Sequence, residues 1–147
     1  MCGFNSTVNH DYTEFKRSVI ASVYFDILII TETHCIREEL VTIENYIVYQ
    51  FNRTGQDNAR RGSGGVAIAI HNSVLDNHVV ISVDKGMDGQ LSIKLKHVEN
   101  DFLLGILALY LPPENYIYGR DPENFFNHAS ALYEDLSGCD LVIGGGI

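Results

Sequence analysis

The 147-residue chain lacks the features of a membrane or secreted protein. No apolar run approaches the roughly 20 residues that a membrane-spanning helix needs. The longest such run, residues 102–111, is typical of a buried strand. The N-terminal residues do not show the basic and then apolar pattern of a secretory signal. We therefore expect an intracellular protein of the nucleus or cytoplasm, with no membrane as partner.

Cysteine is also scarce, and the three cysteines are too scattered for a disulfide framework. Cys2, Cys35 and Cys139 form no CxxC pair, and no two histidines have the spacing of a zinc site. We expect reduced cysteines in or near the core, since free cysteine behaves as a small apolar residue.

Basic residues are few as well. Ten Lys and Arg stand against 19 Asp and Glu, which gives a net charge of −9 at pH 7. This balance argues against a protein that grips nucleic acid through a broad basic face. It is compatible with a phosphate held at one point through a divalent cation, because the cation reverses the local sign of charge.

What the chain does contain is enough apolar sequence for a packed core, with 46% hydrophobic and 20% charged residues. Hydrophobic periodicity predicts helices at 11–24 and 122–136, a short helix or turn at 36–44, and strands at 25–31, 46–51, 65–71, 79–83, 90–97, 102–110 and 140–143. Continuous apolar strands, typical of burial on both faces, mix with alternating ones. This pattern predicts an α/β fold in which two packed mixed sheets are flanked by helices.

Local signals refine two of these elements. Residues 90–97 alternate between apolar and polar, so we expect Ser92 and Lys94 to point away from the core. Asp121 and Pro122 suit the start of the last helix as its cap and its first residue.

The glycine run at residues 62–65 invites comparison with a dinucleotide-binding loop. That motif needs a strand before it and a helix after it. Here an arginine-containing polar loop precedes the glycines and a β-branched strand follows them. No Lys-Ser or Lys-Thr pair follows either glycine cluster, so the chain has no P-loop. We interpret the glycines as residues that let a loop enter a strand.

Three of the predicted strands end in candidate functional residues. Glu32 follows the first apolar strand, Tyr110 ends the second, and residues 144–146 follow the third with three glycines. Strand ends are where open α/β sheets place their ligand groups. If these strands lie side by side, their ends converge, and Glu32 faces Tyr110 across a shared cleft.

Each of these side chains also has a simpler explanation. A carboxylate at a strand end is solvated, salt-bridged or a ligand of a hard metal ion. Tyr110 is a core residue with a satisfied hydroxyl, or it directs that hydroxyl at a ligand. His34 contacts a phosphate or is an ordinary surface histidine. The residue types alone leave these alternatives open.

Taken in order, four segments resemble the endonuclease/exonuclease/phosphatase superfamily. DILIITETH is similar to its first metal-ligand segment, and LALYLPPE to the segment with its active-site tyrosine. RRGSGGVAIAI resembles the glycine-rich strand entry of its retrotransposon-type members. DPENFFNHASALYEDLSGCDLVIGG resembles the helix and strand that lead to the Gly-Gly-Asp-Phe-Asn motif. The ordered set is most similar to endonuclease domains of non-LTR (LINE-type, AP-endonuclease-like) retrotransposons.

The resemblance implies a four-layered α/β sandwich and metal-dependent hydrolysis of DNA phosphodiesters, with Mg²⁺ or Mn²⁺ as cofactor. It implies that Glu32 ligates the metal ion and that Tyr110 hydrogen-bonds the scissile phosphate, so that both are catalytic. His34 is a further candidate phosphate contact. The chemistry would be in-line attack by water, with the metal neutralising charge on the phosphoryl oxygens.

The chain also departs from the family pattern. Gly146 and Ile147 stand where the family has Asp-Phe-Asn, and the first strand and the later Asp-His pair have no counterpart. We therefore expect residues 1–147 to form a partial domain, incomplete at both ends, with little or no turnover alone. The alternative is a non-catalytic remnant or binding module that retains the fold. Sphingomyelinase, inositol-phosphatase and deadenylase relatives are not distinguished by these residues.

Overall fold

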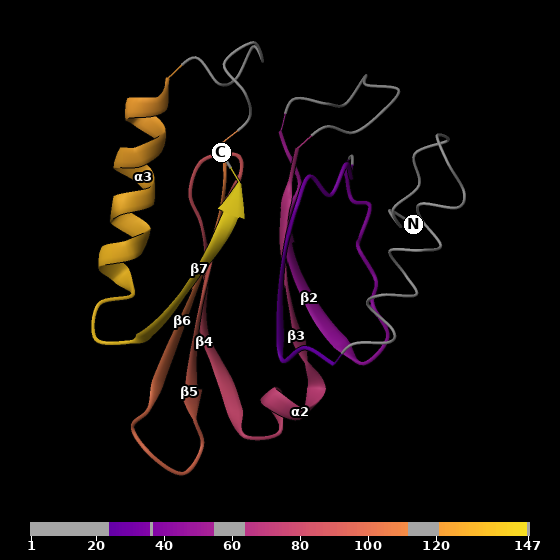
Figure 1. Ribbon diagram of the computed structural model, residues 1–147, viewed down its shortest axis with the longest axis vertical. Helices are drawn as coiled ribbons and strands as arrows, with labels where there is room; N and C mark the ends of the chain where they lie inside the picture. Colours follow the sequence, from indigo (N-terminus) through magenta and orange to yellow (C-terminus); the bar gives the residue numbers. More distant parts are fainter. Residues whose placement is uncertain (1–23, 36, 55–63, 112–120, 147) are drawn as a thin grey trace.

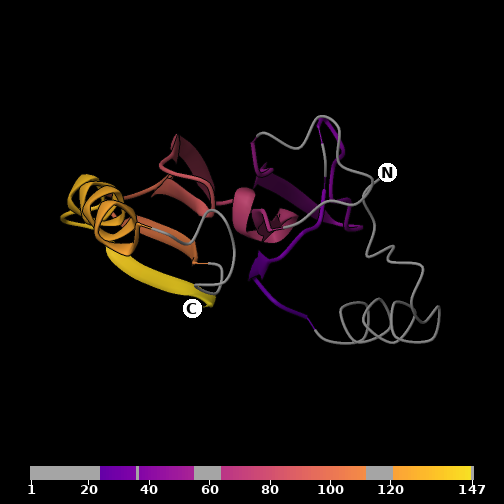
Figure 2. The same cartoon turned by 90° about the horizontal axis from the view of Figure 1, so that it is seen from above.

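The computed structural model describes residues 24–35, 37–54, 64–111 and 121–146. Two β-sheets pack face to face, one of three strands in the order β1-β3-β2 and one of four strands in the order β4-β5-β6-β7. Helix α3 lies against the outer face of the four-stranded sheet (Figures 1 and 2). The predicted fold class, an α/β sandwich, is confirmed. The predicted helix at 11–24 lies almost wholly outside the described residues.

The elements in chain order are β1 (Ile27–Thr31), β2 (Tyr46–Phe51), β3 (Val66–His71), α2 (Asn72–Leu75), β4 (His78–Lys85), β5 (Gln90–His97), β6 (Leu103–Tyr110), α3 (Pro122–Asp135) and β7 (Asp140–Gly146). Every predicted strand is present, and α3 ends one residue before its predicted end. Between residues 36 and 44 the described part contains a turn and no helix. Helix α2 is not predicted by the hydrophobic pattern.

Strand pairing explains how distant segments reach the same edge of the sandwich. In the three-stranded sheet β3 pairs antiparallel with both β1 and β2. In the other sheet β4, β5 and β6 are antiparallel, whereas β7 returns through α3 to run parallel to β6. A parallel pair of this kind needs a crossover connection, which α3 supplies. As a result β6 and β7 end together, with Tyr110 paired to Gly146.

The main core lies between the two sheets and consists of aliphatic side chains from the strand centres. Its fully buried members are Val66, Ile68, Ile70, Leu91, Ile93, Leu95, Ile106 and Ala108. A second core lies between β6 and α3, where Leu107 packs with Leu132 and Leu136. The side chain of Asp121 accepts a hydrogen bond from the Asn124 N–H at 2.9 Å, and Pro122 opens the helix, as predicted.

Two predictions about burial are wrong, and in both cases neighbouring elements are the reason. Ser92 is buried rather than outward-facing, because α3 covers that face of β5. Lys94 on the same face is half-buried and donates to the backbone carbonyl of Asp135, at the end of α3. The continuous apolar runs of β1 and β7 are typical of strands buried on both faces, yet β1 is half-buried throughout and Ile143 of β7 is 54% exposed. Each is an edge strand of its sheet, so one flank is open.

The cysteines behave differently from one another. Cys139 is a free, half-buried thiol, in agreement with the expectation. Cys35 is fully buried and disulfide-bonded, so the expectation of a reduced thiol is wrong there. Cys2 lies outside the described residues. None of the described helices is long and apolar enough to cross a membrane.

The packing of α3 on β6 leads to a first prediction. Replacing Leu132 by Ala should lower the free energy of unfolding by about 2–4 kcal/mol, because the buried side chain leaves a cavity between helix and sheet. Tyr133→Ala, one residue along, is the matched control, since that side chain is 54% exposed. Urea denaturation of both variants measures the difference. Equal losses in the two variants would show that α3 is not docked through Leu132.

Candidate functional site

Two of the predicted site residues meet at one edge of the sandwich. Glu32 directly follows β1, and Tyr110 ends β6 in the facing sheet. The Tyr110 hydroxyl donates a hydrogen bond to Oε1 of Glu32, across 78 positions of the chain. Gly146, at the end of β7, pairs with Tyr110 on the other side (Figure 1). The expected convergence of three strand ends is therefore present in the fold.

The chain after β1 is held by backbone hydrogen bonds to the glycine run. The Thr33 N–H donates to the Gly65 carbonyl at 3.3 Å, and the His34 N–H donates to the Gly64 carbonyl at 3.0 Å. Glu32 has a φ of 55° and His34 a φ of 53°, in the left-handed region that non-glycine residues seldom adopt. Strain of this kind persists only where the surroundings impose it, and it often marks a functional site.

Gly65 explains why this contact is possible. Its φ is +85°, and a Cβ atom there would lie 2.4 Å from the Thr33 hydroxyl oxygen. Only glycine allows both the left-handed backbone and the close approach of the two segments. Gly64 and Gly65, the described glycines of the run, therefore lead the chain into β3. They also fix the position of the segment that carries Glu32.

The backbone of Tyr110 is held in place by hydrogen bonds at the end of the four-stranded sheet. Its N–H donates to the Gly89 carbonyl at 2.8 Å, and the next N–H, of Leu111, donates to the Gly146 carbonyl at 3.0 Å. The Tyr110 ring packs against the main core while the side chain remains half-buried. Glu32 is exposed, so its carboxylate faces solvent beyond the hydroxyl that it accepts from.

The third predicted site residue, His34, lies on the same strained segment, and its side chain is exposed. No hydrogen bond joins its side chain to Glu32 or Tyr110. The structure therefore brings Glu32 and Tyr110 into contact and leaves His34 close in sequence but separate. The roles of all three residues remain predictions.

Glu32 is the natural candidate for holding a metal ion. Among the described residues, no three His, Cys, Asp or Glu side chains form a cluster that could cage an ion. Mg²⁺ commonly binds proteins through only one or two carboxylates, and keeps water or substrate phosphate as its other ligands. One exposed carboxylate with unused lone pairs fits that mode of binding and does not fit an all-protein cage.

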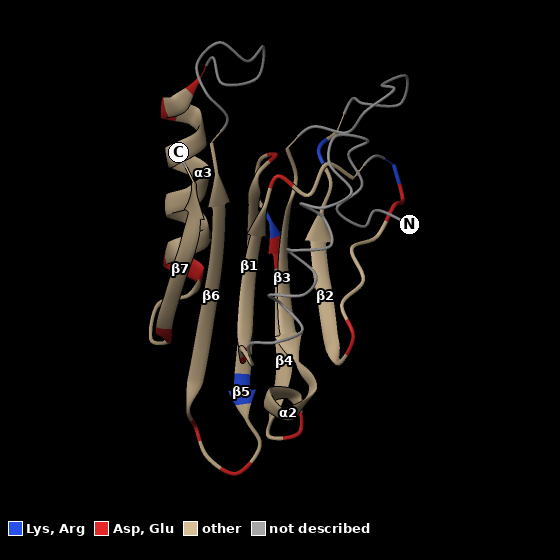
Figure 3. Cartoon of the chain, turned by 45° about the vertical axis from the view of Figure 1, so that its right-hand side comes forward, with Lys and Arg blue, Asp and Glu red and all other residues tan. Residues whose placement is uncertain are grey.

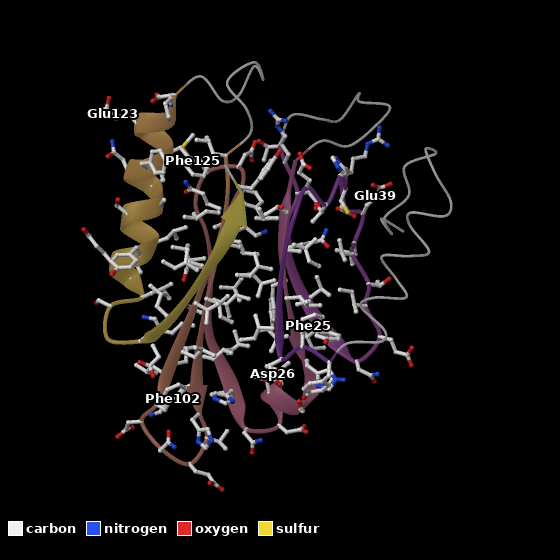
Figure 4. The ribbon with its side chains drawn as sticks, viewed as in Figure 1. Phe25, Asp26, Glu39, Phe102, Glu123 and Phe125 are labelled. Atoms are coloured by element: carbon white, nitrogen blue, oxygen red, sulfur yellow. The ribbon has the colours of Figure 1, made fainter. Side chains whose placement is uncertain are left out.

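A pocket of about 400 Å³ adjoins Tyr110, and the sequence analysis missed it. It is lined by Phe51, Arg53, Thr54, Gly64, Gly65, Gly86, Met87, Asp88, Gly89, Tyr110, Leu111, Asp121 and Phe125. These residues come from both sheets and from the start of α3, and Phe125 lies on the side of α3 that faces the sheets (Figure 4). The turn at residues 86–89 is visible in the sequence, but nothing local shows that it meets the end of β2.

The pocket is bridged by polar contacts between its walls. The Asp88 carboxylate accepts hydrogen bonds from the N–H and the hydroxyl of Thr54, with distances between 3.0 and 3.3 Å. Gln90 is fully buried and donates to the Phe125 carbonyl at 2.7 Å, which ties the turn to α3. The Lys85 ammonium lies 5.1 Å from the centroid of the Phe51 ring. These contacts hold both sheets and the helix around one hollow.

The charged side chains of the described residues agree with the expectation that the protein has no broad basic face. Acidic residues are concentrated in the turns at both ends of the sandwich, and basic residues are scattered (Figure 3). The described Lys and Arg residues are Arg37, Arg53, Lys85, Lys94 and Lys96. Arg53 is only 6% exposed, so its cation contributes to the pocket wall rather than to an open surface. Within the described residues there is no broad basic face.

Comparison with known proteins bears on the fold. The sequence matches no protein-family model and no curated protein. The structure is similar to that of the human Nocturnin catalytic domain, solved with a bound sulfate anion, with a TM-score of 0.54 and 13% sequence identity. The match covers 82% of this chain and 50% of that one, so this chain spans about half of that domain's length. At this identity the likeness shows a shared fold alone.

The close approach at Gly65 leads to a second prediction. Gly65→Ala should lower the free energy of unfolding by about 3 kcal/mol, from a left-handed alanine and a collision with Thr33. Gly138→Ala is the matched control, because its φ is +82° and nothing lies within 4 Å of an added Cβ. That variant should lose about 1 kcal/mol. Chemical denaturation measures both losses. A Gly65→Ala variant as stable as Gly138→Ala would show that the close approach of Gly65 to Thr33 does not stabilise the fold.

Proposed function

We propose that this chain carries the metal-binding and phosphate-contacting part of a metal-dependent phosphodiesterase site, of the DNA endonuclease type that accompanies retrotransposons. The observation that supports it is the direct hydrogen bond between Tyr110 and Glu32, at an edge where three strands end. A phenol and a carboxylate held together in this way can engage one phosphate from two sides. The substrate is DNA, and the cofactor is Mg²⁺ or Mn²⁺.

The two side chains have different roles in this proposal. The exposed Glu32 carboxylate holds the divalent cation, which when bound neutralises charge on the phosphoryl oxygens and lowers the pKa of its water. Tyr110 donates its hydroxyl hydrogen to a non-bridging phosphate oxygen, whose charge grows in the transition state. In the absence of a phosphate the same hydrogen is donated to Glu32. His34, exposed on the neighbouring segment, is a further phosphate contact.

One further feature favours a nuclease over other phosphodiesterases, and two more are compatible with binding of a phosphate at one point. The ordered DILIITETH, RRGSGGVAIAI and LALYLPPE segments are most similar to retrotransposon endonucleases, and the Pro-Pro pair after Tyr110 belongs to that pattern. The structural neighbour was solved with sulfate, an anion of phosphate shape and charge. The net charge of −9 suits a substrate held at one metal-bridged phosphate rather than along a basic groove.

A second candidate function is a non-catalytic binding module. It is favoured by Gly146, which stands where the resemblance implies a water-activating aspartate. Under that alternative Glu32 is an ordinary surface residue whose hydrogen bond to Tyr110 only supports the fold. The two candidates therefore differ in whether the Glu32 carboxylate has affinity for a divalent cation.

Metal binding by the 147-residue chain gives a third prediction. Glu32→Gln should weaken Mn²⁺ binding at least tenfold, because it removes the charged ligand while preserving size. Tyr110→Phe should leave the Mn²⁺ affinity within about threefold, since a phenol is not the proposed ligand. Glu44→Gln, an exposed glutamate away from the site, is the control. Electron paramagnetic resonance of free Mn²⁺ measures the affinities. Equal binding by wild type and Glu32→Gln would favour the binding module.

Catalysis gives a fourth prediction, for a longer protein that contains this chain together with the rest of such a domain. That protein should nick supercoiled plasmid DNA in the presence of Mg²⁺ and stop when EDTA is added. Tyr110→Phe should lower kcat by roughly 10²-fold, the usual loss when one donor to a developing oxyanion is removed. Tyr133→Phe, an exposed tyrosine on α3, should have wild-type activity. Nicking that survives both EDTA and Glu32→Gln would exclude the proposed site.

A further inference from the structure

The pocket beside Tyr110 has a composition that the phosphate chemistry does not require. Its lining residues include two phenylalanines, Phe51 and Phe125, and Met87, and most of its surface is apolar. Arg53 adds one positive charge, and Asp88 and Asp121 add two negative charges. Its volume of about 400 Å³ lies within the range of small-molecule sites, and such sites combine an apolar lining with a few polar groups.

We propose that this pocket binds the nucleobase of a nucleotide whose phosphate lies at Glu32 and Tyr110. The inference rests on the proposed function, which it extends from the phosphate to the base beside it. Tyr110 joins the two places, because it lines the pocket and its hydroxyl contacts Glu32. A base in the pocket and a phosphate at the carboxylate then belong to one nucleotide or to two adjacent ones.

The apolar lining matches the faces of a base. Nucleobases are flat and aromatic, and proteins commonly bind unstacked bases against aromatic side chains. Phe51 projects from the end of β2, and Phe125 from the first turn of α3, so aromatic groups reach the hollow from two different layers of the fold. Met87, from the turn between β4 and β5, adds an adaptable apolar surface.

The charged groups match the edge of a base, which carries both N–H donors and ring or carbonyl acceptors. The Asp88 carboxylate accepts hydrogen bonds from Thr54. Because an ionised carboxylate has about four lone-pair sites, it can accept a further hydrogen bond from a base N–H. The Arg53 guanidinium supplies donors suited to base acceptors.

Binding of small ligands to the 147-residue chain, without added metal, tests this inference. The probes are nucleoside 5′-monophosphates, the corresponding nucleosides, and ribose 5-phosphate, which lacks a base. NMR titration of the protein amides gives the affinities. Nucleotides should bind at least about fivefold more tightly than ribose 5-phosphate, the lower end of what one base stacked on an aromatic residue contributes. Equal binding of ribose 5-phosphate and the nucleotides would overturn the proposal.

Substitutions at Met87 locate the site. Met87→Trp should fill the pocket and weaken nucleoside binding at least fivefold, whereas Met87→Leu, of similar volume, should keep it within twofold. Both variants are checked for cooperative urea unfolding. If Met87→Trp does not fold, Asp88→Asn takes its place, with a several-fold loss expected, and Asp101→Asn at the far end of the sandwich is its control. Nucleoside binding that both pocket variants leave unchanged would place the base elsewhere and reject the pocket.

A small apolar compound such as benzyl alcohol distinguishes a base site from a general apolar hollow. If it binds as tightly as the nucleosides and with the same dependence on Met87, the nucleobase assignment is wrong. Weaker binding than that of the nucleosides supports the assignment, because the apolar compound lacks the base-edge donors and acceptors expected to meet Asp88 and Arg53.

The outcome for the pocket can be separated from that for the phosphate site. Glu32→Gln should leave the affinity for an uncharged nucleoside unchanged, because Glu32 does not line the pocket. If nucleosides bind to the pocket but the longer protein does not nick DNA, the proposed function is refuted and base binding remains supported. Mg²⁺-dependent nicking without nucleoside binding would refute the pocket alone.

Discussion

The candidate site depends on the backbone contact between the glycine run and the segment that follows β1. Gly64 and Gly65 accept hydrogen bonds from His34 and Thr33, and the absence of a side chain at Gly65 lets the two segments touch. This contact holds the chain in the left-handed conformation that turns Glu32 out of the strand direction. Without it, no local preference would keep a glutamate there, because the left-handed region is unfavourable for a residue with a Cβ.

Tyr110 reaches the same place by an independent route through the second sheet. The parallel pairing of β6 and β7 and the hydrogen bond from Tyr110 to Gly89 fix its backbone, and packing of its ring fixes its direction. The hydrogen bond to Glu32 therefore joins two sheets whose positions are each set by other contacts. A site assembled from two rigid supports keeps its geometry better than one carried by a single loop, which is what phosphate chemistry requires.

The fold of this protein is shown by structural similarity, whereas its function is proposed from individual side chains. The sandwich is shared with a catalytic domain of 13% identity, and one fold commonly serves several chemistries. The proposed phosphodiester chemistry depends instead on one carboxylate and one phenol in contact at a strand edge. The neighbouring pocket, with aromatic and charged residues in its walls, lies at the same edge of the sandwich.

Features that arise from local periodicity and capping follow from the amino-acid sequence alone. Strands 46–51 and 90–97 have their predicted bounds, and Asp121 caps α3, because alternation and side-chain capping are properties of a few consecutive residues. The resemblance of the ordered segments also pointed to Glu32 and Tyr110. Only the tertiary structure decided the burial of Ser92, the exposed edges at β1 and β7, and the pocket around Arg53 and Asp88. These features depend on which segments lie side by side, and residues that are far apart in the chain carry no local signal of their proximity.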